Sequence, residues 1–134
     1  KVSNCDVGST KGSFQTLNVV PSTPTKGVPL SFTGKGTISV AVPSATWNLS
    51  VKWNGIQLYT HEGNACVTSK VNLPLNAGTL TIDAIDCPTT ANGPLDVALN
   101  VVLPTAIPSG LYDIELKGLD GSEELYCIEG NFNL

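Results

Sequence analysis

The sequence of 134 residues contains no arginine, and all seven of its cationic side chains are lysines. Charged residues make up only 13% of the chain, against about 25% in an average soluble protein. Nucleic-acid-binding domains depend on basic patches and on the forked guanidinium group. With a formal net charge of −4, we therefore expect no nucleic-acid partner.

The sequence also has no apolar run close to the roughly 18 residues of a membrane-spanning helix, so we expect a soluble chain. It has one histidine, His61, which the local alternation places on the polar face of a strand end. A catalytic triad or a zinc site would need that histidine inside a site, so we interpret it as a surface residue. We expect no enzyme, no metal and no cofactor.

Threonine, valine and isoleucine are abundant, and these β-branched residues favour strands. Short alternating runs are separated by glycine and proline, and no stretch has helical periodicity. This pattern predicts an all-β sandwich or barrel, and the length indicates a single domain over residues 1–134. The expected strands are 13–20, 28–33, 37–41, 46–53, 56–62, 79–85, 95–103, 111–118 and 124–133.

Asn54-Gly55 predicts a two-residue hairpin turn that pairs Trp53 with Ile56 and Val51 with Leu58. Strand alternation then puts the following residues on one apolar face: Trp47, Leu49, Val51, Trp53, Ile56 and Leu58. The opposite, polar face contains Asn48, Ser50, Lys52, Gln57, Tyr59 and His61. The two tryptophans suggest either sugar stacking or a core position, and their apolar neighbours favour the core or a cavity wall.

The four cysteines are Cys5, Cys66, Cys87 and Cys127, which allow three disulfide connectivities. No CxxC pair indicates redox chemistry, so structural disulfides in an oxidising compartment are expected. Asn48-Leu49-Ser50 is an N-glycosylation sequon, and Asn48 falls on the polar face, which is consistent with attachment. We predict a secreted protein or one of the endolysosomal or vacuolar lumen.

Several short motifs follow one another along almost the whole chain. They are the early Cys5, the segment Val20-Pro21 with Pro24 and Lys26-Gly27, the hairpin from Leu49 to Leu58, Cys66 ahead of Cys87-Pro88, Leu103-Pro104, Ile107-Pro108-Ser109-Gly110-Leu111-Tyr112, Asp120-Gly121, and Leu125-Tyr126-Cys127. In this order the chain resembles the ML lipid-recognition domain family, which includes fungal phosphatidylglycerol/phosphatidylinositol transfer proteins and the Niemann–Pick type C cholesterol-transfer protein. Many members have six cysteines, and the four here are more similar to the fungal proteins. The stretch between Cys66 and Cys87 is longer than usual, and we expect an additional loop at 72–77.

The resemblance implies an immunoglobulin-like two-sheet β-sandwich with an apolar cavity between the sheets. It makes Cys66 the partner of Cys87, and we predict the disulfides Cys5–Cys127 and Cys66–Cys87. Pro104, Ile107 and Pro108 match the family segment near the cavity mouth. The residues expected to contact lipid are Phe32, Leu49, Val51, Trp53, Ile56, Leu58, Val101, Leu103, Pro104, Ile107, Pro108, Tyr112, Ile114, Ile128 and Phe132.

The function that the resemblance implies is binding of one lipid and its transfer between membranes, with phospholipid as first choice and sterol as second. This requires transient membrane contact, whereas a protein acceptor is not identified by the sequence. Because the net charge is negative, we expect transfer to anionic membranes to be faster under acidic conditions. The alternative is a glycan-binding or adhesion sandwich with a closed core, which predicts exposed tryptophans.

Overall fold

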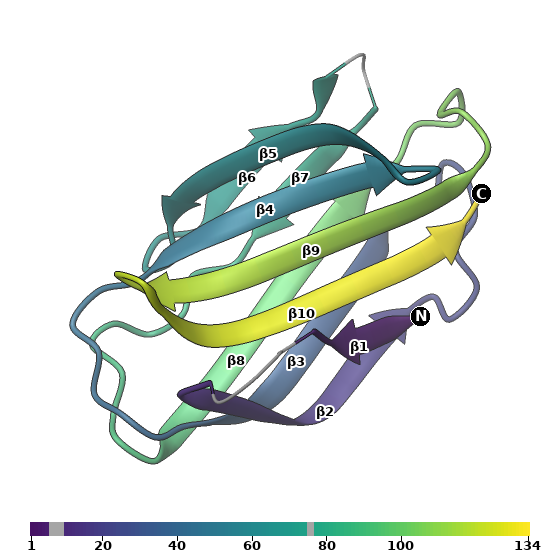
Figure 1. Ribbon diagram of the computed structural model, residues 1–134. Coiled ribbons are helices and arrows are strands. Elements are labelled where there is room, and N and C mark those ends of the chain that lie inside the picture. Colours follow the sequence, from purple (N-terminus) through teal and green to yellow (C-terminus); the bar gives the residue numbers. More distant parts are fainter. Residues whose placement is uncertain (6–9, 75–76) are drawn as a thin grey trace.

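The computed structural model describes residues 1–5, 10–74 and 77–134, which form two antiparallel sheets packed face to face (Figure 1). The first sheet contains, in spatial order, β1 (Val2–Asn4), β10 (Glu123–Asn133), β9 (Leu111–Asp120), β4 (Thr46–Trp53) and β5 (Ile56–Asn64). The second contains β2 (Gly12–Val20), β3 (Leu30–Ile38), β8 (Gly93–Val102), β7 (Thr79–Ile82) and β6 (Ser69–Asn72). The predicted two-sheet sandwich is confirmed. In the described ranges, no helix is long and apolar enough to cross a bilayer.

Alternation along the strands buries one face of each sheet. On β8, Leu95, Val97, Leu99 and Val101 are buried at every second position, while the residues between them are more exposed. The central strands β9 and β10 supply the facing layer, which includes Ile114, Leu116, Leu125, Ile128 and Phe132. The two apolar faces therefore form one continuous core between the sheets.

Two of the predicted strands, 28–33 and 37–41, are one continuous strand, β3, and their separation was wrong. The glycines at 34 and 36 suggest a break by pattern, but both lie within the ladder between β2 and β8. A Cβ atom at Gly34 would lie only 2.8 Å from the Phe14 ring, so this glycine makes room for a close contact. The short edge strands β1 and β6 were not predicted.

The β4–β5 hairpin has the predicted turn but a different register beyond it. Asn54 and Gly55 have φ values of 49° and 81°, as a type I′ turn requires, and Trp53 pairs with Ile56. A bulge then shifts the ladder, so that Val51 pairs with Tyr59 instead of Leu58. Because one extra residue exchanges the two faces of a strand, the predicted polar face was wrong at Tyr59 and His61. Tyr59 packs against the core. His61 pairs with Leu49 and so belongs to the other face than predicted, but it is still exposed, as expected for a surface histidine.

Both predicted disulfides are present. Cys5–Cys127 joins the segment after β1 to β10, with its Cα atoms 5.0 Å apart. Cys66–Cys87 joins the crossover from β5 to β6 with the segment that precedes β8, with its Cα atoms 5.6 Å apart. The first bridge lies within one sheet, and the second supports the place where the chain passes from one sheet to the other.

Candidate functional site

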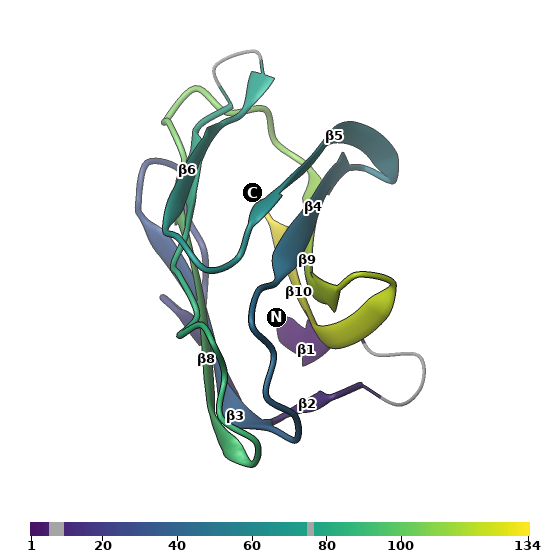
Figure 2. The same ribbon diagram turned by 90° about the vertical axis from the view of Figure 1, so that its left-hand side faces the viewer.

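An apolar cavity lies between the two sheets near one end of the sandwich. Its volume is about 20 Å³, and its walls come from β4, β5, β8, β9 and β10 and from two loops. Figure 2 shows the two sheets side by side, with the edge strands β5 and β6 in the upper part of the picture. The lining residues are Val51, Leu58, Tyr59, Leu73, Pro74, Ala77, Val101, Leu103, Ile107, Tyr112, Ile114 and Phe132.

The cavity lies beside strand β5, at one edge of the first sheet. Leu58 is 37% exposed although its side chain lines the cavity, and Leu73 on the facing loop is half-buried. No hydrogen-bonded ladder joins the edge strands β5 and β6. Side-chain packing alone therefore closes this side of the cavity.

The inner end of the cavity is built around Tyr112, which is buried on β9. Its ring stacks on Phe132 with the ring centroids 5.6 Å apart, and its hydroxyl donates a hydrogen bond of 2.8 Å to the carbonyl oxygen of Pro108. Burial raises the pKa of Tyr112 above its usual value, so this side chain stays neutral at physiological pH. Tyr112 thus connects the cavity wall to the loop at 103–110.

Further polar contacts hold the same loop at the end of the sandwich. Trp53 Nε1 donates to the Ser109 carbonyl oxygen over 3.1 Å, and Lys26 Nζ donates to Ser109 Oγ over 2.7 Å. Gly110 and Leu134 exchange two backbone hydrogen bonds of 3.0 Å each. The loops at this end are therefore connected to one another around the cavity.

Comparison with known proteins places this architecture in a family. The sequence matches the family model of the ML domain over residues 1–134. The chain belongs to the ML domain family. It is also 27% identical over 135 residues to a candidate phosphatidylglycerol/phosphatidylinositol transfer protein of Dictyostelium discoideum, covering 98% of this chain and 84% of that protein.

Two solved structures support the fold of this ML domain. A Niemann–Pick type C2 protein from the Japanese carpenter ant superposes with a TM-score of 0.65 at 14% identity, covering 99% of this chain and 98% of that one. An alkylpurine DNA glycosylase of Pseudomonas fluorescens gives a TM-score of 0.53 at 10% identity, covering 95% of this chain and 31% of that one. At these identities the likeness concerns the sandwich architecture and its immunoglobulin-like form.

The structure brings eight of the fifteen predicted lipid-contact residues together around the cavity of this ML domain. They are Val51, Leu58, Val101, Leu103, Ile107, Tyr112, Ile114 and Phe132. Their contact with a lipid stays a prediction. Four further residues line the cavity and were not predicted: Tyr59, Leu73, Pro74 and Ala77. Strand periodicity shows neither the bulge in β5 nor the positions of Leu73, Pro74 and Ala77 outside the strands. Residues 75–76 of the expected additional loop lie outside the described residues.

Seven predicted residues do not line the cavity. Phe32 and Ile128 are buried elsewhere in the core, where the Phe32 ring packs against Gly130, and Leu49 is buried farther along β4. Trp53 is half-buried, and Ile56 is 62% exposed, so an inward position for Ile56 was wrong. Ile56 is exposed because it directly follows the turn, where no strand covers it. Pro104 and Pro108 lie in the loop at the end of the sandwich, and Pro104 lines a shallow groove on the outer side of β8.

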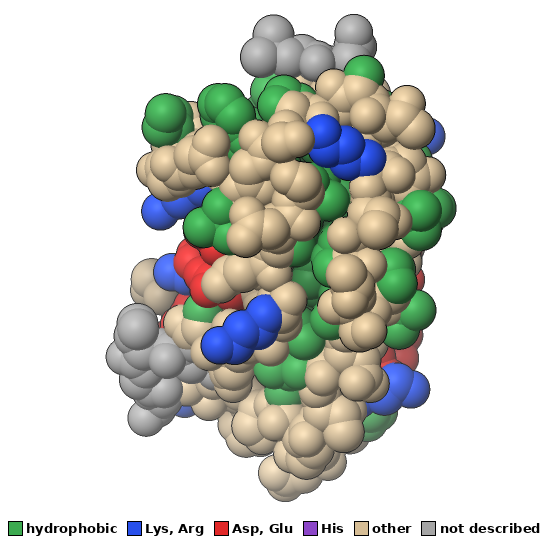
Figure 3. Space-filling model, turned by 90° about the vertical axis from the view of Figure 1, so that its right-hand side faces the viewer, with side chains coloured by type: hydrophobic (Ala, Val, Ile, Leu, Met, Phe, Trp, Pro, Cys, Tyr) green, Lys and Arg blue, Asp and Glu red, His purple; other side chains and the backbone are tan. Residues whose placement is uncertain are grey.

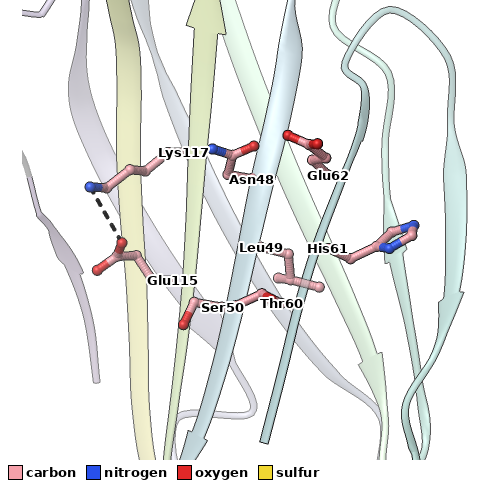
Figure 4. A pocket seen from close by; sticks show the side chains of 8 residues that line it. All are labelled: Asn48, Leu49, Ser50, Thr60, His61, Glu62, Glu115 and Lys117. Atoms are coloured by element: carbon pink, nitrogen blue, oxygen red, sulfur yellow. Dashed lines mark ion pairs between the residues drawn. The ribbon is translucent and has the colours of Figure 1, made fainter. Parts of the chain in front are cut away.

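A larger but open groove of about 650 Å³ lies on the outer face of the first sheet. Figure 4 shows its side chains, which come mainly from β4, β5 and β9 and include Asn48, Ser50 and Glu62. Lys117 lies 3.6 Å from Glu115 at one side of it, in a solvent-exposed ion pair that contributes little stability. Most of its lining side chains are polar or charged, but Leu49 also contributes, and the groove is too open to bury a ligand. Asn48 is exposed there, and its glycosylation stays a prediction.

Groups that could bind a metal ion are scarce in the described ranges. One trio of potential ligand atoms lies close together, formed by Cys5, Cys127 and Glu115. Both cysteines are joined in a disulfide, so their sulfur atoms are not thiolate ligands. A single carboxylate remains, which falls short of the ligand sets of protein metal sites.

Proposed function

We propose that this ML domain binds one lipid between its sheets, shields the apolar part from water and carries it between membranes. The observation that carries the proposal is the apolar cavity between the sheets, which Leu58 of the edge strand β5 helps to line. Family membership and the name of the Dictyostelium relative support a phospholipid as first choice and a sterol as second. The proposed activity is carriage of the ligand, with no catalytic step.

The cavity must widen before it can hold such a ligand. Its volume of about 20 Å³ is near that needed for one water molecule, whereas ligand pockets measure roughly 300–1,000 Å³. The side formed by Leu58, Leu73 and Pro74 is closed by packing between an edge strand and a loop, and no ladder hydrogen bonds would break there. We propose that the lipid separates these groups and enters from this side.

The expected gain is large enough to offset such a rearrangement. Each methylene group removed from water contributes about 0.8 kcal/mol, so burying ten carbons of an acyl chain contributes roughly 8 kcal/mol. An apolar cavity wall also distinguishes poorly between acyl chains of similar size. The headgroup would remain at the surface near the 103–110 loop, where it keeps its hydration.

The compartment we propose is extracellular or the lumen of an endolysosome or vacuole. The two disulfides persist in an oxidising environment, which such compartments provide. The competing interpretation, a glycan-binding sandwich, relies on exposed tryptophans. Trp47 is instead almost fully buried and Trp53 is half-buried, so neither offers a free ring face on the outer groove.

The test is native mass spectrometry of the purified, disulfide-bonded protein after incubation with a mixture of phospholipids and sterols. A one-to-one adduct, identified by fragmentation, is expected and would name the ligand. A folded protein that stays free of every lipid in the mixture would contradict lipid carriage.

A pair of variants tests whether the cavity holds that lipid. Leu58→Asp places a carboxylate at the cavity edge and should weaken lipid binding about tenfold or more, because a charge there opposes an apolar ligand. Val67→Asp is the matched control, since Val67 is 52% exposed and does not line the cavity. Equal lipid binding by both variants would place the ligand elsewhere.

A further inference from the structure

The indole N–H of Trp47 is buried without a hydrogen-bond partner. Trp47 lies on β4 and is 1% exposed, and no group of the described residues accepts a hydrogen bond from its Nε1 atom. The other tryptophan differs, because Trp53 Nε1 donates to the Ser109 carbonyl oxygen. A buried donor without an acceptor costs free energy, and buried tryptophans usually find a partner. Trp47 therefore marks a place between the sheets that can receive an acceptor atom.

The N–H edge of the Trp47 ring faces the edge strand β5. A Cβ atom at Gly63 would lie 2.5 Å from Cζ2 and 2.8 Å from Cε2 of Trp47, so this edge of the ring packs directly on the Gly63 backbone. Nε1 is bonded to Cε2 and lies on the same side of the ring. Because Gly63 has no side chain, β5 places none beside the N–H group. This part of the interior thus adjoins the edge from which the lipid is proposed to enter.

A row of aromatic rings connects the cavity with this N–H group. Tyr59 lines the cavity, and its ring stacks on His61 with the ring centroids 5.8 Å apart. The His61 ring in turn lies 5.6 Å from the ring of Trp47. In Figure 4, His61 points away from Glu115 and Lys117 of the outer groove. The row therefore follows the inner side of β5 from the cavity to Trp47.

The interior along this row is apolar and long enough for a lipid chain. Leu49 and Val71 are buried on β4 and β6. Figure 3 views the molecule from the side opposite to Figure 2 and shows hydrophobic side chains along its middle, between polar surfaces. A strand rises about 3.3 Å per residue, so Leu58 and Gly63 lie about 16 Å apart along β5. An extended acyl chain of ordinary length spans this distance.

We infer that Trp47 Nε1 is the inner polar group of the lipid site and selects lipids whose acyl chain has a hydroxyl group at its far end. The headgroup of such a lipid stays near the 103–110 loop, the chain follows β5, and the indole N–H donates to the hydroxyl oxygen. His61 lies beside the same indole ring, and a ring nitrogen of a neutral imidazole can accept the hydroxyl proton. The inference rests on the proposed function, because the lipid must first enter the cavity.

The selection arises from the unpaired donor. A plain chain of the same length places a methyl group against the N–H and leaves this donor without an acceptor. A hydroxylated chain loses the hydration of its hydroxyl group but gains hydrogen bonds in apolar surroundings, where such bonds are strong. Sites with a buried polar group discriminate in this way against analogues that lack the matching group.

The experiment compares palmitoyl lysophosphatidylglycerol with its ω-hydroxylated derivative, both below their micelle concentrations, by competition in native mass spectrometry. The unmodified protein should bind the hydroxylated lipid about tenfold more tightly. Trp47→Phe should lose this preference, because it keeps an aromatic ring but has no N–H. Trp53→Phe is the matched control and should keep the preference, since its Nε1 already has an acceptor. Uptake of the plain lipid by Trp47→Phe shows that this variant is folded.

A second measurement does not depend on the folding of Trp47→Phe. In Trp53→Phe the only indole is that of Trp47, and its N–H proton resonance should move downfield with the hydroxylated lipid but not with the plain one. Equal binding of the two lipids by the unmodified protein, or a resonance that does not move, would overturn the selection and leave lipid carriage intact. Binding of neither lipid would contradict the proposed carrier function itself.

Discussion

At the scale of single residues, the ring and the hydroxyl of Tyr112 contribute to the structure in two different ways. Its ring forms the inner wall of the cavity and stacks on Phe132, while its hydroxyl binds the carbonyl of Pro108. A phenol suits this place because its body is apolar and its tip is polar. One side chain thus couples the cavity to the loop above it.

Replacing Tyr112 by phenylalanine should lower the free energy of unfolding by about 1 kcal/mol, because the Pro108 carbonyl loses its hydrogen bond. Urea unfolding followed by tryptophan fluorescence measures the change. Tyr59→Phe is the matched control, since Tyr59 also lines the cavity but its hydroxyl forms no hydrogen bond within the described ranges. Tyr59→Phe should therefore lower the free energy of unfolding by less than Tyr112→Phe, and equal losses would contradict a stabilising hydrogen bond from Tyr112.

The burial of Tyr126 predicts how the stability of the protein changes at alkaline pH. It is almost fully buried against Phe14, and this burial raises the pKa of its hydroxyl far above the usual value of 10. Above pH 10 the unfolded chain releases this proton while the folded chain keeps it, so the free energy of unfolding falls as pH rises. One such group accounts for about 1.4 kcal/mol per pH unit.

The variant Tyr126→Phe should therefore lose less stability than the unmodified protein between pH 10 and 11. The measurement is a series of urea unfolding curves across this range, with pH 7 to 9 as the internal reference. Tyr112, whose pKa is also raised by burial, adds a second contribution that remains in the variant. Identical slopes for both proteins would show that Tyr126 does not ionise on unfolding.

At the scale of elements, the β4–β5 hairpin shows what local sequence can and cannot predict. The turn type follows from Asn54-Gly55, because both residues tolerate a positive φ. The bulge beyond the turn depends instead on how Tyr59 packs against the core. Residues that are distant in the sequence form that core, so the bulge cannot be predicted from the hairpin alone. The element was therefore predicted correctly at its turn and incorrectly at Tyr59 and His61.

Gly55→Ala should reduce the free energy of unfolding by about 1 kcal/mol, because a Cβ atom is unfavourable at a φ of 81°. Apart from Gly55 itself and its two chain neighbours, no described residue has an atom within 4 Å of the position of that Cβ, so the cost arises in the local backbone. Gly55→Asn should cost clearly less, since asparagine tolerates this conformation. Thermal unfolding of both variants tests this, and equal losses would argue against the backbone as the cause.

At the scale of the whole molecule, the net charge determines how the protein approaches a charged membrane. The formal net charge is −4 at pH 7, and the isoelectric point calculated from the sequence is about 4.7. Near pH 5 the net charge is therefore close to zero. This removes the repulsion between the protein as a whole and an anionic membrane.

We expect lipid transfer between anionic vesicles to be faster at pH 5 than at pH 7. The measurement is the rate at which a fluorescent phospholipid moves from donor to acceptor vesicles, with zwitterionic vesicles as the control. Those should show little change, because they lack the surface charge that repels the protein. A rate on anionic vesicles that does not depend on pH would contradict the electrostatic explanation.

The sequence by itself determined the all-β class, the hairpin turn and the family, because strand periodicity, turn residues and motif order are local features. The pairing of Cys66 with Cys87 followed from the family resemblance, Cys5–Cys127 was predicted beside it, and the structure confirms both. Only the tertiary structure decided which apolar residues surround the cavity and which fill the core. Leu58 and Ile56 are both apolar residues of one strand, yet one lines the cavity and the other is exposed. Their difference depends on a bulge and on loops from distant parts of the chain, and packing between such segments leaves no periodic trace in the sequence.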